Sequence, residues 1–303
     1  MNRTDKILQR NSERAAANAI ARNVLCDELC KELGIDPLLP PLPITIEIPS
    51  LPPRASAMPT DWVRTSLFVN LAQNKVQLLK NQILESFGDI KIEFTGEQLN
   101  MFDNDVYLEV VRLAQNRAPG EQILFTRHSF LRNLGLTGGV NNYKALKASL
   151  LKLKSNTIKI ANHKAGKAFS LIDELSWDES VGYGLSIGSV VMEIFSKTAL
   201  SYIDLEARLK LKHPLSKYLQ NYMSGGAPGI QKVKATTLMS LSATSGSLKD
   251  FLGKDRGLQK ALDELKKAGL ISSYLIEKNV TGDTIISWDR RPHRHSKFNA
   301  ATT

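Results

Sequence analysis

The sequence predicts an α+β fold in which one unit of helices and strands occurs twice along the chain. A longer helix is expected in each unit, at residues 141–155 and 255–268, and the two helices carry leucines at the same spacing. These leucines are Leu146, Leu150 and Leu153 in the first helix and Leu258, Leu262 and Leu265 in the second. Each triplet lies on one helical face, and the triplets are 112 residues apart. A short helix precedes each longer helix and two strands follow it, so we expect a structural repeat.

The first unit is expected within residues 60–200. Its elements, in chain order, are a strand at 91–95, a helix at 97–115, a strand at 122–125, a short helix at 127–134, the longer helix at 141–155 and strands at 157–161 and 168–172. Thr126 is expected to cap the short helix and Gly135 to end it. The last two strands are joined by a basic turn and predict a β-hairpin. A helix-turn-helix followed by such a hairpin, called the wing, is a winged helix.

The second unit is expected within residues 201–289 and repeats this order. Its elements are helices at 211–223, 235–241 and 255–268 and strands at 270–277 and 284–288. The predicted fold class is therefore α+β with two tandem winged-helix domains. Three further segments are expected: an N-terminal helical segment at 1–36, a linker at 37–59 that holds eight of the twelve prolines, and a basic C-terminal tail at 290–303.

The chain of 303 residues carries a net charge of +10, which is concentrated toward its C-terminal end. Residues 201–303 contain 17 Lys and Arg against 9 Asp and Glu. No acidic residue lies between Glu121 and Asp173 or between Glu206 and Asp250, although both stretches are rich in Lys and Arg. A surface that lies against phosphates excludes carboxylates, because they repel the phosphate charge. The two acid-free stretches therefore predict two surfaces for a polyanionic partner, most simply nucleic acid.

The longer helix of the first unit is expected to read DNA with the face opposite its leucines. The N-terminal part of a recognition helix contacts base edges, whereas later residues contact phosphates. We therefore expect base contacts from Asn141 and Lys144 and a thymine-methyl contact from Ala148. Phosphate contacts are expected from Lys147 and Lys152.

The second longer helix presents a different set of residues on its exposed face. Arg256 and Gln259 suit bidentate base contacts, Lys260 suits a phosphate, and Lys267 lies on the same face. The wing of the first unit is expected to contact phosphates or a minor groove through His163, Lys164 and Lys167.

The sequence lacks the motifs of several enzyme classes. It contains no Gly-x4-Gly-Lys-Ser/Thr loop, no Rossmann glycine spacing and no His-Glu-x-x-His metal site. We expect a protein that is not an enzyme and that has no catalytic residues, cofactor or metal. Cys26 and Cys30 are interpreted as buried small hydrophobes. No apolar run of 18 residues and no signal-peptide core is present, so we expect no membrane span and a cytoplasmic location.

Over roughly residues 57–289 the chain resembles the TrfA-type plasmid replication initiators. The resemblance rests on ASAMPTDWVRTSLF (55–68), IKIEFTGEQL (90–99), VYLEVVRLAQNRAPGEQILFTRHSFLRNLG (106–135) and ALDELKKAGLI (261–271). It implies two winged-helix domains that bind direct repeats, called iterons, in the double-stranded DNA of a plasmid origin. It also implies opening of an adjacent A+T-rich segment together with the host initiator, and recruitment of the host replicative helicase. Such initiators tend to bind the origin as monomers, with homodimers acting in copy control.

Initiators of this type also carry a sliding-clamp-binding pentapeptide, Gln-Leu-x-Leu-Phe, before the first domain, and this chain has no such motif there. It has Gln98-Leu-Asn-Met-Phe102, in which Leu99 and Phe102 are expected to be core residues, with clamp binding as the alternative. Two other functions stay open from the residues: a winged-helix transcriptional repressor, and a basic scaffold that binds RNA or an acidic protein. The positive charge could also serve solubility alone.

Overall fold

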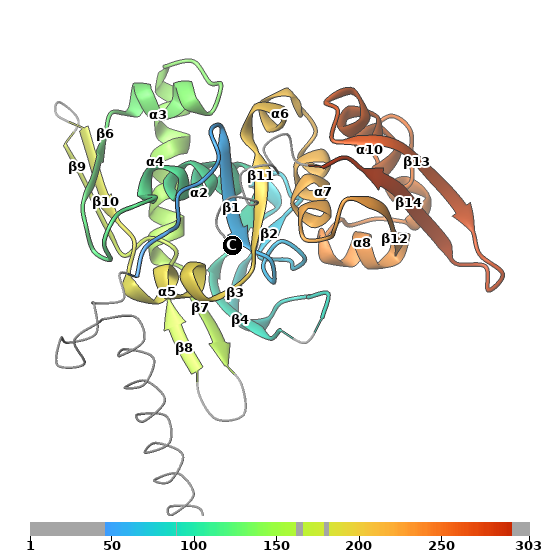
Figure 1. The fold of residues 1–303 in the computed structure, drawn as a ribbon, viewed down its shortest axis with the longest axis horizontal. Coiled ribbons are helices and arrows are strands. Elements are labelled where there is room, and N and C mark those ends of the chain that lie inside the picture. The colour runs from blue at the N-terminus through green and yellow to red at the C-terminus, as the bar shows by residue number, and fades with distance from the viewer. Residues whose placement is uncertain (1–45, 89, 162–165, 179–181, 293–303) are drawn as a thin grey trace, which may run out of the picture. The chain divides into compact units, whose positions relative to one another are not determined.

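The computed structural model describes residues 46–88, 90–161, 166–178 and 182–292. The predicted helical segment at 1–36, the first part of the predicted linker and most of the predicted tail lie outside the described residues. From Ile46 onward the chain forms one compact unit of helices and small sheets. The α+β fold class is thereby confirmed (Figure 1).

The first predicted unit contains a helix, a strand, two helices and a hairpin, in that order. These elements are α2 (Met101–Ala114), β6 (Ile123–Phe125), α3 (Arg127–Asn133), α4 (Val140–Ser155), β9 (Glu174–Asp178) and β10 (Gly182–Ser186). Thr126 caps α3 as predicted, because its side-chain oxygen accepts a hydrogen bond from the Ser129 N–H. The three strands form an antiparallel sheet in the order β6-β10-β9.

The second predicted unit repeats this plan with one additional short helix. Its elements are α7 (Pro214–Ser224), β12 (Gly229–Lys234), α8 (Ala235–Leu241), α9 (Leu248–Phe251), α10 (Leu258–Lys267), β13 (Ile271–Lys278) and β14 (Thr284–Arg290). Its antiparallel sheet has the order β12-β14-β13, so in both units the last strand lies between the other two. All six leucines of the predicted triplets are fully buried. The two units share the strand order of their three-stranded sheets, but the first has the β7–β8 hairpin between its longer helix and the matching hairpin, so the predicted element order holds only in part.

The hairpin predicted as the first wing belongs to a different sheet. It consists of β7 (Thr157–Ala161) and β8 (Gly166–Phe169), and β7 pairs with β4 (Ile92–Glu97), which pairs with β3 (Leu78–Ile83). The hairpin that shares a sheet with β6 is β9–β10. The predicted hairpin at residues 157–172 is therefore confirmed as a hairpin, but its strand β7 pairs with β4 and not with β6.

The described part of the predicted linker is built into the fold. β1 (Ala55–Pro59) is buried throughout and pairs antiparallel with β11 (Leu200–Asp204), and Ile48 is fully buried. The linker prediction is thus wrong for this part of the segment. The remaining elements are β2 (Phe68–Val69), which pairs parallel with β5 (Leu99–Asn100), the 3-10 helix η1 (Gln73–Lys75), α5 (Ser189–Lys197) and α6 (Leu205–Lys210). Leu99 is buried in β5, and α2 begins only at Met101, four residues later than predicted.

Candidate nucleic-acid interface

The exposed face of α4 carries most of the side chains predicted for it. Leu146, Leu150 and Leu153 are turned into the core, which leaves Asn141, Lys144 and Ala148 exposed to solvent. α4 contains no acidic residue, and Lys144 makes no ion pair with any residue that the structure describes. This face can therefore approach a phosphate backbone without charge repulsion.

Lys147 lies at the edge of this face and contacts the β9–β10 hairpin. Its Nζ atom lies 4.4 Å from the centroid of the Trp177 ring in β9, a cation–π contact. Trp177 pairs across the hairpin with Tyr183 in β10. The side chain of Lys147 is thus held between α4 and β9.

The second unit has a corresponding contact between its β13–β14 hairpin and its longer helix. Tyr274 in β13 pairs with Trp288 in β14, and its hydroxyl donates a hydrogen bond of 2.7 Å to Oδ1 of Asp263 in α10. Gln259 also hydrogen-bonds Tyr274 and is half-buried. In both units an aromatic side chain of the first strand of the hairpin is therefore fixed against the longer helix.

The exposed side of α10 is basic. Arg256, Lys260 and Lys267 are exposed, as predicted. The predicted helix start at residue 255 is wrong, because α10 begins at Leu258 and Arg256 lies in the turn before it. A guanidinium in that turn extends beyond the N-terminal end of the helix, which is the end that reaches base edges in helix-turn-helix proteins.

Lys152 does not lie on the exposed face of α4. Its side chain is 5% exposed, and its Nζ atom lies 3.0 Å from Oδ2 of Asp103 and 3.1 Å from Oε1 of Glu97. The predicted exposure of Lys152 is wrong, because an ion pair with a buried aspartate of α2 draws its ammonium group inward. A phosphate could reach this ammonium only if the buried pair opened.

The predicted contacts of the hairpin at 157–172 are also changed. Lys167 in β8 forms an ion pair with Glu193 in α5, which also binds Lys197. His163 and Lys164 lie outside the described residues. The Lys167 side chain therefore has a structural partner, on a hairpin that is not part of the β6 sheet.

Arg127 is a basic residue of this surface that the sequence reasoning missed. It is the first residue of α3, and its Cζ atom lies 4.6 Å from the centroid of the Tyr143 ring in the first turn of α4. The contact places a guanidinium beside Lys144 and the N-terminal end of α4. The sequence feature that could have identified Arg127 is its position directly after the predicted cap Thr126.

Part of the positive charge in the acid-free stretches is neutralised within the fold. Cations of these stretches that form ion pairs with carboxylates elsewhere in the chain include Lys152, Lys159, Lys167, Arg208, Lys217 and Lys234. The cations of the two acid-free stretches are therefore not all available for a polyanion. The first stretch mixes cations that hold the fold with cations that are exposed on α4, whereas Arg256 and α10 lie beyond the second stretch.

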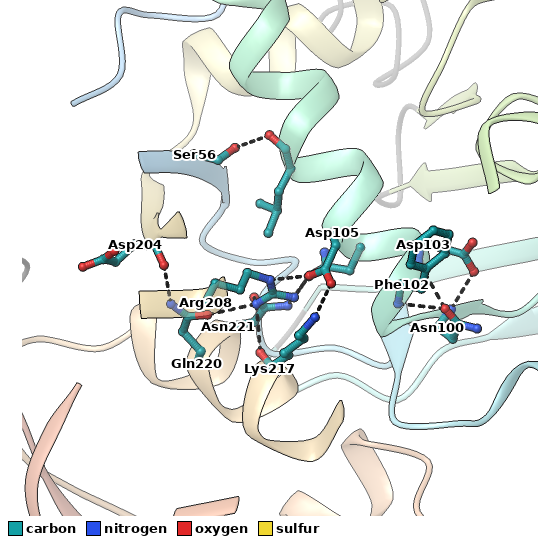
Figure 2. Close-up of polar contacts among 12 residues, drawn as sticks. Ser56, Asn100, Phe102, Asp103, Asp105, Asp204, Arg208, Lys217, Gln220 and Asn221 are labelled. Atoms are coloured by element: carbon teal, nitrogen blue, oxygen red, sulfur yellow. Dashed lines mark hydrogen bonds and ion pairs between the residues drawn. The ribbon is translucent and has the colours of Figure 1, made fainter. Parts of the chain in front are cut away.

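A buried polar cluster joins the two predicted units (Figure 2). Arg208 of α6 is 2% exposed, and its Nε donates to Oδ1 of Asp105 in α2 at 2.5 Å. Its remaining N–H groups donate to Asn104 at 2.6 Å, to Gln220 and Asn221 at 3.1 Å each, and to the Lys217 carbonyl at 3.2 Å. Lys217 of α7 also binds Asp105. These contacts satisfy a buried guanidinium, which a single carboxylate could not do.

Comparison with known proteins places the chain in a family. A family model described as TrfA protein matches residues 44–281. The chain belongs to the TrfA family. This confirms the resemblance drawn from the four sequence blocks and supports a role as a replication initiator.

Two crystal structures of RctB domains have a similar arrangement of elements. Selenomethionine derivatives of domains 2 and 3 of RctB align with a TM-score of 0.53 at 11% identity, over 78% of this chain and 99% of that chain. A second structure of RctB domains 2–3 aligns with a TM-score of 0.48 at 10% identity, over 75% and 95%. The first alignment shows a shared fold. The sequence matches no curated protein.

The described residues give no sign of a metal centre or a membrane segment. Within them, no three His, Cys, Asp or Glu side chains are grouped so that they could hold a metal ion. Across the same ranges, every helix is too short or too polar to cross a bilayer.

Proposed function

We propose that this TrfA-family protein initiates plasmid replication by binding direct repeats in origin DNA through two winged-helix modules. The observation that carries the proposal is the repeat itself. Each unit has the same strand order, and each presents a basic face on or next to its longer helix, α4 or α10. In this proposal α4 and α10 are recognition helices that enter major grooves, and β9–β10 and β13–β14 are the wings.

The two helices would read different base sequences. Asn141 and Lys144 stand at the N-terminal end of α4, whereas Arg256 and Gln259 stand at the N-terminal end of α10. Amide and guanidinium groups form bidentate contacts with adenine and guanine edges, respectively. Two non-identical readers on one chain fit an asymmetric direct repeat, whereas two identical readers would fit a palindrome.

Binding, rather than catalysis, is the proposed activity of this chain. Occupied repeats would strain an adjacent A+T-rich segment until it opens, and the exposed strands would receive the host helicase in the bacterial cytoplasm. Repression of its own promoter would use the same DNA-binding surface. No feature of the described residues favours that role over initiation.

The test uses the full chain and duplexes from the DNA that flanks its gene. We expect tight binding to a duplex that contains direct repeats and weak binding to a scrambled duplex. Lys144→Ala and Arg256→Ala should each lose about 1–3 kcal/mol for the repeat, or roughly 5- to 150-fold in affinity. Lys197→Ala is the matched control, because this exposed lysine of α5 binds Glu193 and lies on neither longer helix.

Two outcomes would contradict the proposal. Equal affinity of the wild type for repeat and scrambled duplexes would refute sequence-specific origin binding. An equal loss on both duplexes in Lys144→Ala and Arg256→Ala would refute the assignment of these residues to base contacts.

A further inference from the structure

α2 carries two aspartates that hold different parts of the protein. Asp103 and Asp105 are two positions apart, so their side chains leave the helix on different sides. Asp103 binds Lys152 of α4 at 3.0 Å. Asp105 binds Arg208 of α6 and Lys217 of α7 (Figure 2). One helix therefore makes buried ion pairs with the first recognition helix and with the second module.

The contact at Asp105 is rigid because its cationic partner Arg208 is hydrogen-bonded on several sides. The Arg208 guanidinium donates to five acceptors on α2 and α7, and Asn221 of α7 donates to the same Asn104 oxygen at 2.9 Å. A rotation of α7 relative to α2 would break several of these bonds at once in a buried site. Such a cluster favours one orientation of the two helices over neighbouring ones.

A third polar contact fixes α10 to α7. Oε2 of Glu264 in α10 accepts hydrogen bonds from the Lys212 and His213 N–H groups at 3.0 Å each and from Ser216 Oγ at 2.8 Å. These groups belong to the N-terminal end of α7, where His213 itself provides no side-chain cap. A carboxylate from α10 thus takes the place of the missing cap.

The three contacts form one series from α4 through α2 and α7 to α10. We propose that Asp105, Arg208 and Lys217 are positioning residues, which set the separation and rotation at which α4 and α10 reach DNA. The proposal rests on the two-module binding proposed above and adds what determines the spacing of the two half-sites. A flexible connection would tolerate several spacings, whereas a fixed one accepts a single spacing.

The experiment measures how affinity depends on half-site spacing. The full chain is bound to its preferred duplex, selected from a random library, and to the same duplex with one or two base pairs inserted between the half-sites. Each inserted pair moves one half-site by about 3.4 Å and rotates it by about 35°. The variants are Asp105→Asn and Lys217→Met. The control is Arg54→Met, which removes an exposed ion pair between Arg54 and Glu206 of α6.

We expect the wild type and Arg54→Met to lose at least about tenfold in affinity on insertion, because one module disengages. Asp105→Asn and Lys217→Met should lose about threefold or less in affinity on insertion, since in these variants the two modules can change their separation and rotation. A purely structural defect would lower the affinity for the original and the lengthened duplex alike, and would leave the ratio of the two affinities as in the wild type. Lys217→Met retains the Arg208–Asp105 pair, so it tests the proposal even if Asp105→Asn folds poorly.

Two results would contradict this inference. If the wild type loses affinity on insertion and both variants lose as much, Asp105 and Lys217 do not set the spacing and the inference is wrong. If the wild type binds all spacings equally, the two modules are not held at one spacing and the inference is wrong; the function proposed above fails only if the wild type does not distinguish the repeat duplex from a scrambled one.

Discussion

Replacing Lys152 with methionine should destabilise the fold, although a lysine on a DNA-reading helix would ordinarily be assigned to phosphate binding. Methionine keeps the length of the buried stem but removes the ammonium that lies 3.0 Å from Asp103. The Asp103 side chain is 1% exposed, so its carboxylate cannot recover solvation by water. Removal of one partner from a buried ion pair costs about 3–5 kcal/mol. We expect a value near the lower limit, because Asp103 keeps its hydrogen bond from the Asn100 N–H at 2.9 Å.

Thermal denaturation followed by circular dichroism measures this cost. At about 2–4 °C per kcal/mol, a cost near 3 kcal/mol should lower Tm by roughly 6–12 °C. Lys154→Met, two residues away on the exposed side of α4, should change stability by about 0.5 kcal/mol or less. The double variant Lys152→Met with Asp103→Asn should recover part of the loss, because asparagine carries no buried charge. Equal Tm values for Lys152→Met and Lys154→Met would refute this explanation of Lys152.

Three further predictions concern the chain ends, salt and pH. Removal of residues 1–45 should leave DNA affinity unchanged in a gel-shift assay, whereas removal of 1–56 takes away Ile48 and part of β1 and should abolish folding; equal behaviour of the two truncations would contradict this. DNA affinity should fall by about 10³–10⁵ between 50 and 200 mM salt if ~6–10 phosphates are contacted, and a flat titration would exclude such an interface. Burial lowers the pKa of His213, as does Lys260, while Glu264 and a hydrogen bond to the Arg256 backbone raise it in part. Because the folded pKa lies below the unfolded value of 6.5, the stability contributed by neutral His213 should be lost as pH falls below about 6.5. Thermal scans from pH 5 to 8 should show Tm falling as pH drops below about 6.5 in the wild type and not in His213→Gln. The same fall of Tm in both proteins would contradict this prediction.

The repeat could be predicted because its signals are local. Leucine spacing, the Thr126 cap and the turn glycines act over a few residues, and they placed α3, α4, α8, β7 and the strands β13 and β14 within a few positions. The wing could not be assigned in the same way. Two hairpins follow α4, and which of them pairs with β6 depends on contacts about 60 residues apart, such as Phe125 with Tyr183.

The buried cations escaped prediction for a related reason. Lys152 lies beside the leucine stripe of α4, and its partner Asp103 is 49 residues earlier in the chain. Arg208 and Asp105 are 103 residues apart. One signal was available: Asp103 and Asp105 stand in the first turns of a helix with many apolar residues, and acidic residues that become buried need cationic partners. That pattern indicates that partners exist but does not identify them.

The central claim is that one chain reads a single asymmetric DNA site with two different helices. The most direct measurement is selection of binding sites from a random duplex library with the full-length monomer, followed by sequencing. We expect two unlike blocks of preferred bases, with centres about 10–10.5 base pairs apart and in one fixed order. Arg256→Ala should erase the preference in one block, and Lys144→Ala should weaken it in the other. A single block, or a palindrome of two identical blocks, would contradict the account.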